Sequence, residues 1–251
     1  MVGSVLRILR KSVALRGVAG TVALGIETAW GRRVWSSLWR APQPCEFDRN
    51  YGTDTGASVV QTEDLTGPNW TYSVRYSPTA SAKLQEMLAA LSIRHEDFIF
   101  IDFGSGKGRV LLLASELPFK AIIGLELSKQ LHQVAQRNVA VYKSAGQACK
   151  RIECVLTDAA LYEIPPAPTV CYFNNPFREP VMTQVVRRLE ASLDLTPRQM
   201  FILYYVPWCQ HLFSRSKYFR AFRVTREYAI YQSAISTGPQ SDEQTCARLA
   251  G

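Results

Sequence analysis

The sequence has no apolar run long enough to cross a membrane, only three histidines and no Cys-x-x-Cys pair. Arg16 and Glu27 interrupt the apolar stretches near its start, so none reaches the roughly 18 residues of a membrane-spanning helix. Six cysteines without close pairing favour reduced structural thiols over disulfides, and three histidines leave few zinc ligands. We therefore expect no metal site and a cytoplasmic location.

Positive charge is concentrated at the start of the chain. The formal net charge is +8, and residues 1–40 hold seven Lys and Arg side chains against Glu27 alone. The remaining residues are close to neutral, which argues against a basic nucleic-acid-binding groove on the folded part. We interpret residues 1–40 as a basic helical extension. Peripheral membrane contact and an organelle transit peptide are the alternatives for this segment.

Two segments beside the main pattern have few apolar residues. Residues 41–75 are rich in Gly, Pro, Thr, Asp and Asn, which predicts a loop without helix or strand, long enough to cover a site. Residues 234–251 predict a polar C-terminal tail that frays. Between them, the pattern turns helical after Tyr76-Ser-Pro-Thr79, with Pro78 or Thr79 placed to start the helix.

From residue 98 the chain alternates short apolar runs with helical stretches, the pattern of a parallel sheet covered on both faces. The last two apolar runs lie so close together that only a hairpin can join them, which makes that pair antiparallel. We therefore predict an α/β domain over residues 76–233, with a mostly parallel seven-stranded sheet and an antiparallel C-terminal hairpin. Strands are expected near 98–103, 121–126, 152–157, 169–174, 200–206, 219–224 and 228–232, and helices near 108–117, 128–143 and 180–193.

A glycine-rich turn follows the first of these strands, with the sequence Asp102-Phe-Gly-Ser-Gly-Lys-Gly108. Glycines at alternate positions let the backbone turn sharply and approach a ligand closely. A dinucleotide fingerprint would need glycine where Arg109 stands, and a phosphate-binding P-loop would need glycine in place of Ile101. The turn therefore indicates a different cofactor class.

Three acidic residues support this interpretation. Asp102 ends the first strand beside the turn, where a carboxylate repels a pyrophosphate and attracts an ammonium group. Glu126 ends the second strand, where an acid can accept hydrogen bonds from both ribose hydroxyls. Asp158 follows the third strand. Because ligands of open α/β sheets bind at the carboxyl ends of the strands, we expect these acids to share one site.

The glycine turn, Glu126 and Asp158 resemble the cofactor motifs of class I S-adenosylmethionine-dependent methyltransferases, over roughly residues 76–233. The resemblance implies a Rossmann-like methyltransferase fold and S-adenosylmethionine as cofactor. It implies that Glu126 binds the ribose and Asp158 the adenine. We also expect Tyr51, Tyr76 and Thr79 to form a lid or to contact the methionine carboxylate. The remaining cofactor-binding residues are expected to be Asp102, Gly104, Ser105, Gly106 and Gly108, with Gly104 and Gly106 at the methionine portion.

On the acceptor side, the fourth strand ends in Asn174-Asn-Pro-Phe177. An Asn side chain can hold an amine for in-line attack, and Phe177 can stabilise positive charge. The turn resembles the Asn/Asp-Pro-Pro-aromatic motif of amino-methyltransferases, but Asn175 replaces the first proline, which weakens any prediction of a nucleobase acceptor. It is closer to the corresponding turn of histone lysine methyltransferases that lack a SET domain. This likeness implies N-methylation, with Asn174 and Phe177 as catalytic residues.

Other readings stay open at this point. The methyl acceptor is a protein amine or a small molecule, attacked through nitrogen or oxygen, with nucleic acid less expected. A cofactor-binding module without catalysis is a further alternative. Arg109 and the hairpin speak against a nicotinamide-dependent oxidoreductase. Tyr204, Tyr205 and Trp208 suit either a substrate pocket or the core, and Cys209-Gln-His211 lacks the third group that a nucleophile needs.

Overall fold

The computed structural model describes residues 45–56 and 78–234, which belong to one compact unit beginning at Pro44. The predictions for residues 1–40, for Tyr76 and for residues 235–251 lie outside this described part. No helix within the described ranges has the length and apolarity that a membrane span requires.

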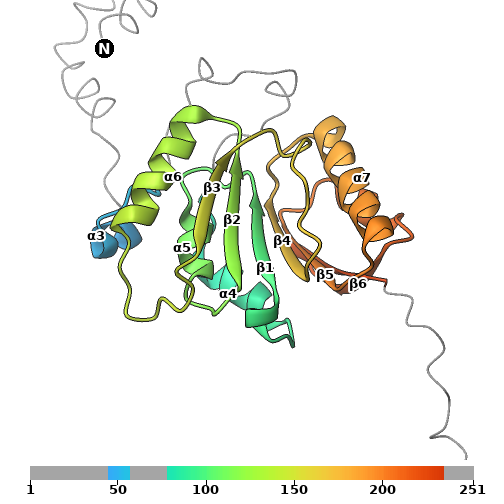
Figure 1. Cartoon of the computed structure of the whole chain (residues 1–251), viewed down its shortest axis with the longest axis horizontal. Coiled ribbons are helices and arrows are strands. Elements are labelled where there is room, and N and C mark those ends of the chain that lie inside the picture. Colours follow the sequence, from blue (N-terminus) through green and yellow to red (C-terminus); the bar gives the residue numbers. More distant parts are fainter. Residues whose placement is uncertain (1–44, 57–77, 235–251) are drawn as a thin grey trace, which may run out of the picture. The chain divides into compact units, whose positions relative to one another are not determined.

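Seven strands form one sheet in the order β3-β2-β1-β4-β5-β7-β6 (Figure 1). The pairs among the first five strands are parallel, while β7 runs antiparallel to β5 and β6 antiparallel to β7. The predicted α/β fold with a C-terminal antiparallel hairpin is confirmed. The strands are β1 (Ile99–Phe103), β2 (Ala121–Glu126), β3 (Ile152–Leu156), β4 (Thr169–Asn174), β5 (Met200–Tyr205), β6 (Phe219–Val224) and β7 (Tyr228–Ser233).

Apolar residues at helical spacing form one buried face on each long helix. In α7, for example, Val181, Val185 and Leu189 recur at helical spacing and are all buried, and a proline lies in the first turn. The α-helices are α3 (Glu46–Tyr51), α4 (Ser81–Ala89), α5 (Arg109–Ala114), α6 (Lys129–Val141), α7 (Glu179–Leu195) and α8 (Gln210–Ser214), with a short 3-10 helix η4 (His95–Asp97).

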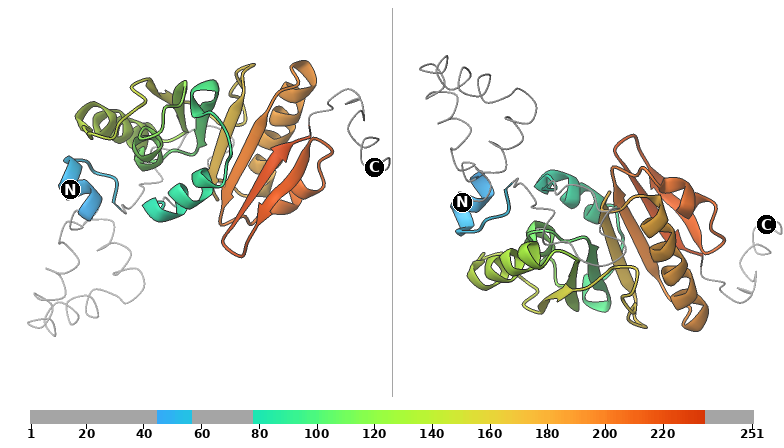
Figure 2. Two further views of the ribbon diagram at one scale, coloured as in Figure 1. Left: turned by 90° about the horizontal axis from the view of Figure 1, so that it is seen from below. Right: turned by 90° about the horizontal axis from the view of Figure 1, so that it is seen from above.

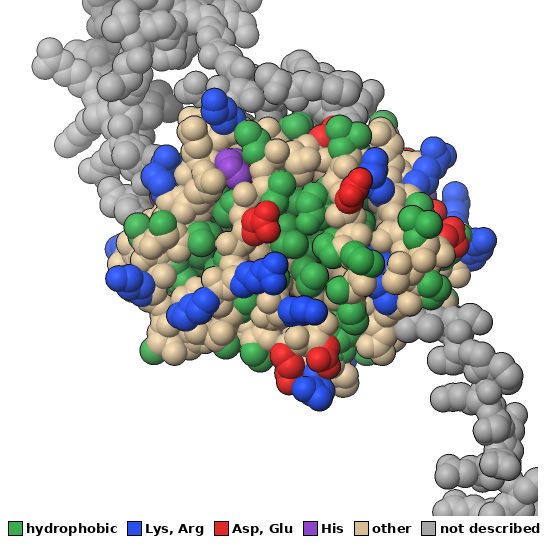
Figure 3. All heavy atoms as spheres, viewed as in Figure 1, with side chains coloured by type: hydrophobic (Ala, Val, Ile, Leu, Met, Phe, Trp, Pro, Cys, Tyr) green, Lys and Arg blue, Asp and Glu red, His purple; other side chains and the backbone are tan. Residues whose placement is uncertain are grey.

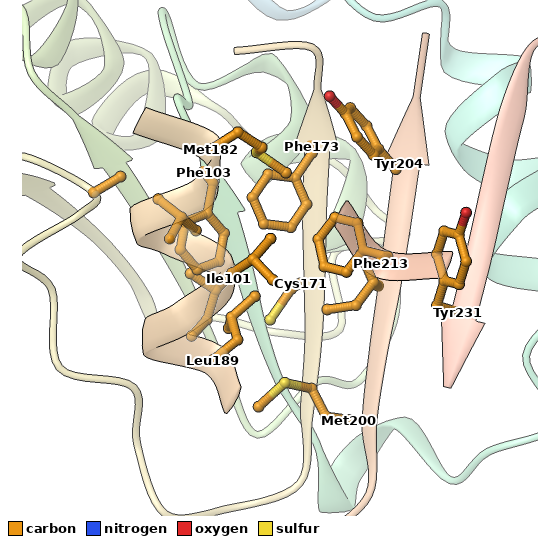
Figure 4. Packing of buried hydrophobic residues seen from close by; sticks show 14 of the residues in the cluster. Ile101, Phe103, Cys171, Phe173, Met182, Leu189, Met200, Tyr204, Phe213 and Tyr231 are labelled. Carbon is orange, nitrogen blue, oxygen red and sulfur yellow. The ribbon is translucent and has the colours of Figure 1, made fainter. Parts of the chain in front are cut away.

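Alternate residues of the central strands enter two separate cores. Ile101, Phe103 and Phe173 pack with α7 and α8 on one face, as the close-up in Figure 4 shows. Phe100 and Tyr172 pack with α4 and α5 on the other face. Figure 2 shows α4 and α7 on opposite sides of the strands. Because both faces are covered, the central strands are apolar over most of their length, as the continuous apolar runs predicted, with polar residues toward their carboxyl ends.

The prediction of a structureless loop over residues 41–75 is wrong for its described part, because residues 46–51 form α3. This helix is too short to show apolar periodicity. It carries acidic side chains in its first turn and ends at Gly52, whose φ of 68° is the left-handed conformation common after helices. Phe47 stacks with Tyr142, so tertiary contact stabilises the helix.

The predicted start of the next helix at Pro78 or Thr79 is also wrong, because α4 begins at Ser81 with Ala80 as its N-cap. The Thr79 hydroxyl is buried and bonds to Tyr172 instead of capping the helix. Helix α8 and η4 were not predicted, since both are short and lie between stronger patterns.

Charge on the folded unit is mixed. On the face seen in Figure 3, Lys and Arg side chains are interspersed with Asp and Glu. This distribution agrees with the nearly neutral balance of the sequence after residue 40. It gives no support to a basic groove across that face.

Phe213 of α8 provides a test of the packing on the α7 face. It is fully buried and contacts the rings of Phe173, Tyr204, Phe219 and Tyr231. We expect Phe213→Ala to lower the free energy of unfolding by about 3–5 kcal/mol, measured in urea, because it leaves a cavity. Leu195→Ala, at a side chain that is 87% exposed, should change it by less than about 0.5 kcal/mol. An equal effect of both variants would contradict the assignment of this core.

Candidate active site

The glycine turn between β1 and α5 depends on backbone that other residues rarely adopt. Gly104, Gly106 and Gly108 have φ values of 85°, 55° and 83°. The N–H groups of Gly104 and Ser105 both donate to the carbonyl of Leu125, at 2.9 Å. A β-carbon on Gly104 would lie 2.6 Å from Cβ of Pro176, so no other residue fits there without a shift. The turn is therefore fixed between the ends of β2 and β4.

Two buried carboxyl groups lie at this edge of the sheet. Asp102 is 3% exposed and Glu126 is 9% exposed. Burial raises the pKa of both, and for Asp102 the charge of Glu126 raises the pKa further. The Glu126 carboxylate accepts hydrogen bonds from the N–H of Gly106 at 2.8 Å and of Ser128 at 2.7 Å, which favour its charged form. The pair makes the site attractive to a cationic group.

The third predicted acid lies at the same edge. The N–H of Thr157 donates to the carbonyl of Glu126 at 2.9 Å, which joins the turn after β3 to the end of β2. Asp158 belongs to this turn, and its carboxylate accepts a hydrogen bond from the N–H of Ala160 at 2.9 Å. The structure thus places Asp102, Glu126 and Asp158 at the ends of three adjacent strands, in the order β1, β2, β3.

The glycine turn also contains a buried polar atom that a ligand can satisfy. Ser105 is 5% exposed, and its Oγ has no hydrogen-bond partner in the described part of the chain. An unpaired buried hydroxyl is costly, so such atoms are rare outside functional sites. Together with the two carboxyl groups, Ser105 fits a cofactor that has a cationic end and several hydroxyls.

The end of β4 is held by a short chain of polar side chains. Thr79 Oγ1 hydrogen-bonds to the hydroxyl of Tyr172 at 2.9 Å, and Nδ2 of Asn174 donates to Thr79 Oγ1 at 3.1 Å. Thr79 is 3% exposed, and its hydrogen bond orients the side chain of Asn174. The predicted contact of Thr79 with the methionine carboxylate stays a prediction. Phe177, three residues on, is partly buried against the core on the α7 face.

Sequence reasoning missed the residues that attach the N-terminal segment to the glycine turn. Lys107, whose side chain is 6% exposed, pairs with Asp54 at 2.5 Å. The amide of Asn138 in α6 accepts a hydrogen bond from the N–H of Asp54 at 2.8 Å and donates to the carbonyls of Asp54 and Lys107. The sequence held one indication of this contact: Lys107 lies inside the turn, and a buried lysine requires an acidic partner.

The rest of this segment is organised by Asp48. Its carboxylate accepts hydrogen bonds from Thr53, Thr55 and Gly56. Although burial opposes it, hydrogen bonds led by that of Thr55 hold the pKa of Asp48 below its usual value. We call residues 45–56 the strap. Tyr51, predicted to be part of a lid, packs in the strap against the rings of Phe47 and Tyr142.

The remaining candidates divide between core and surface. Tyr204 is fully buried and belongs to the core, whereas Trp208 is 74% exposed. His211 bonds to Glu179 at 3.1 Å, and burial raises the pKa of the Cys209 thiol, so the two do not form a nucleophilic pair. In residues 45–56 and 78–234 no group of three His, Cys, Asp or Glu side chains is arranged to hold a metal ion.

The Lys107–Asp54 pair gives a test of the strap. Asp54→Ala leaves a buried ammonium without its partner, and we expect it to lower the free energy of unfolding by about 1–3 kcal/mol. Asp54 itself is 67% exposed at its side chain, which keeps the loss below that of a fully buried pair. In Lys107→Met/Asp54→Ala the loss should be partly recovered, since no unpaired charge remains. Hydrogen exchange across residues 45–56 should rise in the single variant, and unchanged exchange there would contradict the assignment.

Comparison with known proteins adds the family. The family model described as histone methylation protein DOT1 matches residues 58–192. No curated protein matches the sequence. Among solved structures, similar ones include a dimethyladenosine transferase from Plasmodium falciparum, with TM-score 0.45 and 13% identity over 61% of this chain and 60% of that one.

Two further similar structures are methylases. A predicted N6-adenine-specific DNA methylase from Listeria monocytogenes has TM-score 0.47 and 15% identity over 62% of this chain and 51% of that one. An RNA methyltransferase from Salinibacter ruber, solved with S-adenosyl-L-homocysteine, has TM-score 0.43 and 17% identity over 66% of this chain and 98% of that one. The chain thus spans three fifths or less of the Plasmodium and Listeria proteins.

The match to the family model is the decisive one. Its range makes up more than half of the chain and includes the glycine turn, Glu126, Asp158 and the turn from Asn174 to Phe177. The chain belongs to the DOT1 family of histone methylation proteins, which are class I S-adenosylmethionine-dependent methyltransferases.

Proposed function

We propose that this protein transfers the methyl group of S-adenosylmethionine to an amine nitrogen of another protein, with lysine as the acceptor. The observation that carries the proposal is the pair of buried carboxyl groups, Asp102 and Glu126, beside a turn of three left-handed glycines. The lysine acceptor is supported by membership of the DOT1 family. S-adenosylmethionine, when bound, supplies a methyl group on a positively charged sulfur.

The cofactor end of the site follows from the two carboxyl groups. Asp102 attracts the ammonium of the methionine portion, because a buried charge is stabilised by a close opposite charge. A carboxylate has about four acceptor positions, so Glu126 can keep its bonds to Gly106 and Ser128 and still accept from ribose hydroxyls. Ser105 Oγ is available to bond with the ligand. In this proposal Asp158 binds the adenine amino group.

The acceptor end requires positioning more than acid–base chemistry. A lysine nitrogen attacks only as the neutral amine, so its ammonium form must first lose a proton to solvent. Asn174, oriented by Thr79, holds this nitrogen in line with the methyl group. Phe177 stabilises the positive charge that develops on the nitrogen during transfer.

Location in the cytoplasm and membrane contact through residues 1–40 stay predictions.

Transfer of tritium from labelled S-adenosylmethionine into fractionated lysate tests the acceptor. We expect label in the protein fraction, recovered as methyl-lysine after acid hydrolysis, and a rate about 10²-fold lower for Asn174→Ala because the amine is no longer held. Gln184→Ala, at an exposed position of α7, should keep the wild-type rate. Label confined to RNA or small molecules would overturn the lysine assignment. Cofactor binding without any transfer would favour a non-catalytic module.

The raised pKa of Asp102 predicts a pH dependence of cofactor binding. A cation beside this carboxyl group lowers its pKa, so binding should release protons, and affinity should fall as pH falls. Calorimetry in buffers of different ionisation enthalpy measures both effects. Asp102→Asn should bind the cofactor more weakly and with less pH dependence. Asp97→Asn, at the other end of β1, should match the wild type, and an equal pH dependence in Asp102→Asn would contradict this role.

The same substitution should have the opposite effect on folding. Because the folded chain raises the pKa of Asp102 above the unfolded value, stability is lost as pH rises between these two values. Asp102→Asn removes this ionisable group, and with it the cost of either burying its charge or keeping it protonated. The ligand-free variant should therefore melt at a higher temperature than the wild type at neutral pH, by about 2–4 °C for each kcal/mol gained. A lower melting temperature would contradict the raised pKa of Asp102 in the free protein.

A further inference from the structure

Strands β4 and β5 end side by side, each followed by a residue with unusual backbone. Asn174 pairs with Tyr205 in the parallel register, and the next residues, Asn175 and Val206, have φ values of 42° and 49°. Within residues 45–56 and 78–234 they are the two non-glycine residues with positive φ. Asn tolerates this conformation, but for a β-branched residue such as Val it is a true outlier. Strained backbone of this kind gathers at functional sites.

Hydrogen bonds hold the strained strand ends in place. The N–H of Val206 donates to the carbonyl of Glu227 at 2.8 Å, and the N–H of Trp208 donates to the carbonyl of Val206 at 2.9 Å. On the neighbouring strand, Asn174 is tied to Thr79. The turn that contains Asn175 therefore lies between two anchored positions, one on its own strand and one on the next.

The side chain of Asn175 is buried and its amide oxygen is unsatisfied. The residue is 6% exposed, and Oδ1 has no hydrogen-bond partner in the described part of the chain. A buried acceptor without a donor is unfavourable, so its retention calls for a ligand that brings one. The neighbouring Asn174 is oriented through its amide nitrogen, which donates to Thr79.

Asn175 also lies next to the cofactor turn. The following residue, Pro176, is so close to Gly104 that a β-carbon there would lie 2.6 Å from Cβ of Pro176. Gly104 is the first glycine after Asp102, on the side predicted for the methionine portion. Asn175 is therefore one residue from the contact between the turn that ends β4 and the turn proposed to bind the cofactor.

We infer that Asn175 is a second acceptor-binding residue, whose Oδ1 takes a hydrogen bond from the nitrogen that is methylated. This inference rests on the proposed function. A neutral primary amine has two N–H groups and one lone pair, so holding the N–H groups directs the lone pair. In the transfer the nitrogen lone pair forms the N–C bond, while the C–S bond breaks and its electron pair stays on sulfur. Asn175 removes no proton, and the methylated ammonium loses one to solvent.

This role is coupled to the charge that develops during transfer. As the nitrogen becomes positive, its N–H groups become stronger donors, so the bond to Oδ1 is stronger in the transition state than with the free amine. The strained backbone fixes Oδ1 before the acceptor arrives, so little ordering is needed at the moment of reaction.

The test does not require the natural acceptor to be known. Sinefungin is an S-adenosylmethionine analogue that carries an amine where the transferred methyl group lies, whereas S-adenosylhomocysteine has no group there. Calorimetry should show that Asn175→Gly binds S-adenosylhomocysteine as tightly as the wild type but loses about tenfold or more of its affinity for sinefungin. Glycine accepts positive φ, so the variant should melt no lower than the wild type.

Asn175→Asp is the matched variant, because it keeps an oxygen acceptor at the same position, and it should retain the wild-type preference for sinefungin. An unchanged sinefungin preference in Asn175→Gly would overturn the role of Asn175 while leaving the proposed function intact. Loss of the preference in Asn175→Asp as well would contradict the assignment to the oxygen. If the wild type bound neither analogue, the proposed function would fail, and this inference with it.

Discussion

The hydrogen bond from the N–H of Gly106 to the buried carboxylate of Glu126 is the interaction on which the rest of the site depends. It joins the middle of the glycine turn to the end of β2, while the N–H groups of Gly104 and Ser105 bind the carbonyl of Leu125 on the same strand. The turn is thereby held against the end of β2, and on the other side of β1 it contacts Pro176, which follows β4. Because Asp102 lies between these contacts, its carboxyl group is excluded from water. The raised pKa of Asp102 is thus a consequence of how the turn is held.

The charge balance of the turn follows from this arrangement. Lys107 lies within the same turn, but its ammonium pairs with Asp54 of the strap. The pKa values of Asp102 and Glu126 are raised, which is the opposite of what a close lysine would cause. Asn138 holds the strap and the turn together through backbone groups of both. The strap therefore keeps an internal cation away from the site, so that a cationic ligand meets carboxyl groups that are not already paired.

The parts of this arrangement that the sequence predicted are those with local causes. Continuous apolar runs predicted the central strands because the sheet is covered on both faces, and the spacing of Gly104, Gly106 and Gly108 predicted the turn because only glycine adopts its backbone easily. The missing parts join residues far apart in the chain. Asp54 and Lys107 are 53 residues apart, and Thr79 and Asn174 are 95 apart. The periodicity of a sequence carries no information about contacts between such distant residues. Helix α3 is too short to show a helical periodicity of its own. The left-handed Val206 was equally hidden, since a valine gives no sign of it.

These two kinds of cause also explain why the cofactor is easier to assign than the acceptor. The cofactor end is determined by formal charge and by glycine, which can be read from residue types alone. The proposed acceptor end depends on the direction of two amides, and the sequence Asn174-Asn175 does not say how either of them is bonded. The structure separates them, because Asn174 donates to Thr79 whereas Oδ1 of Asn175 is buried without a donor. The backbone strain at Asn175 and Val206 falls at the same register of adjacent strands. The folded sheet therefore already carries the energetic cost of orienting the Asn175 amide before a methyl-accepting substrate binds.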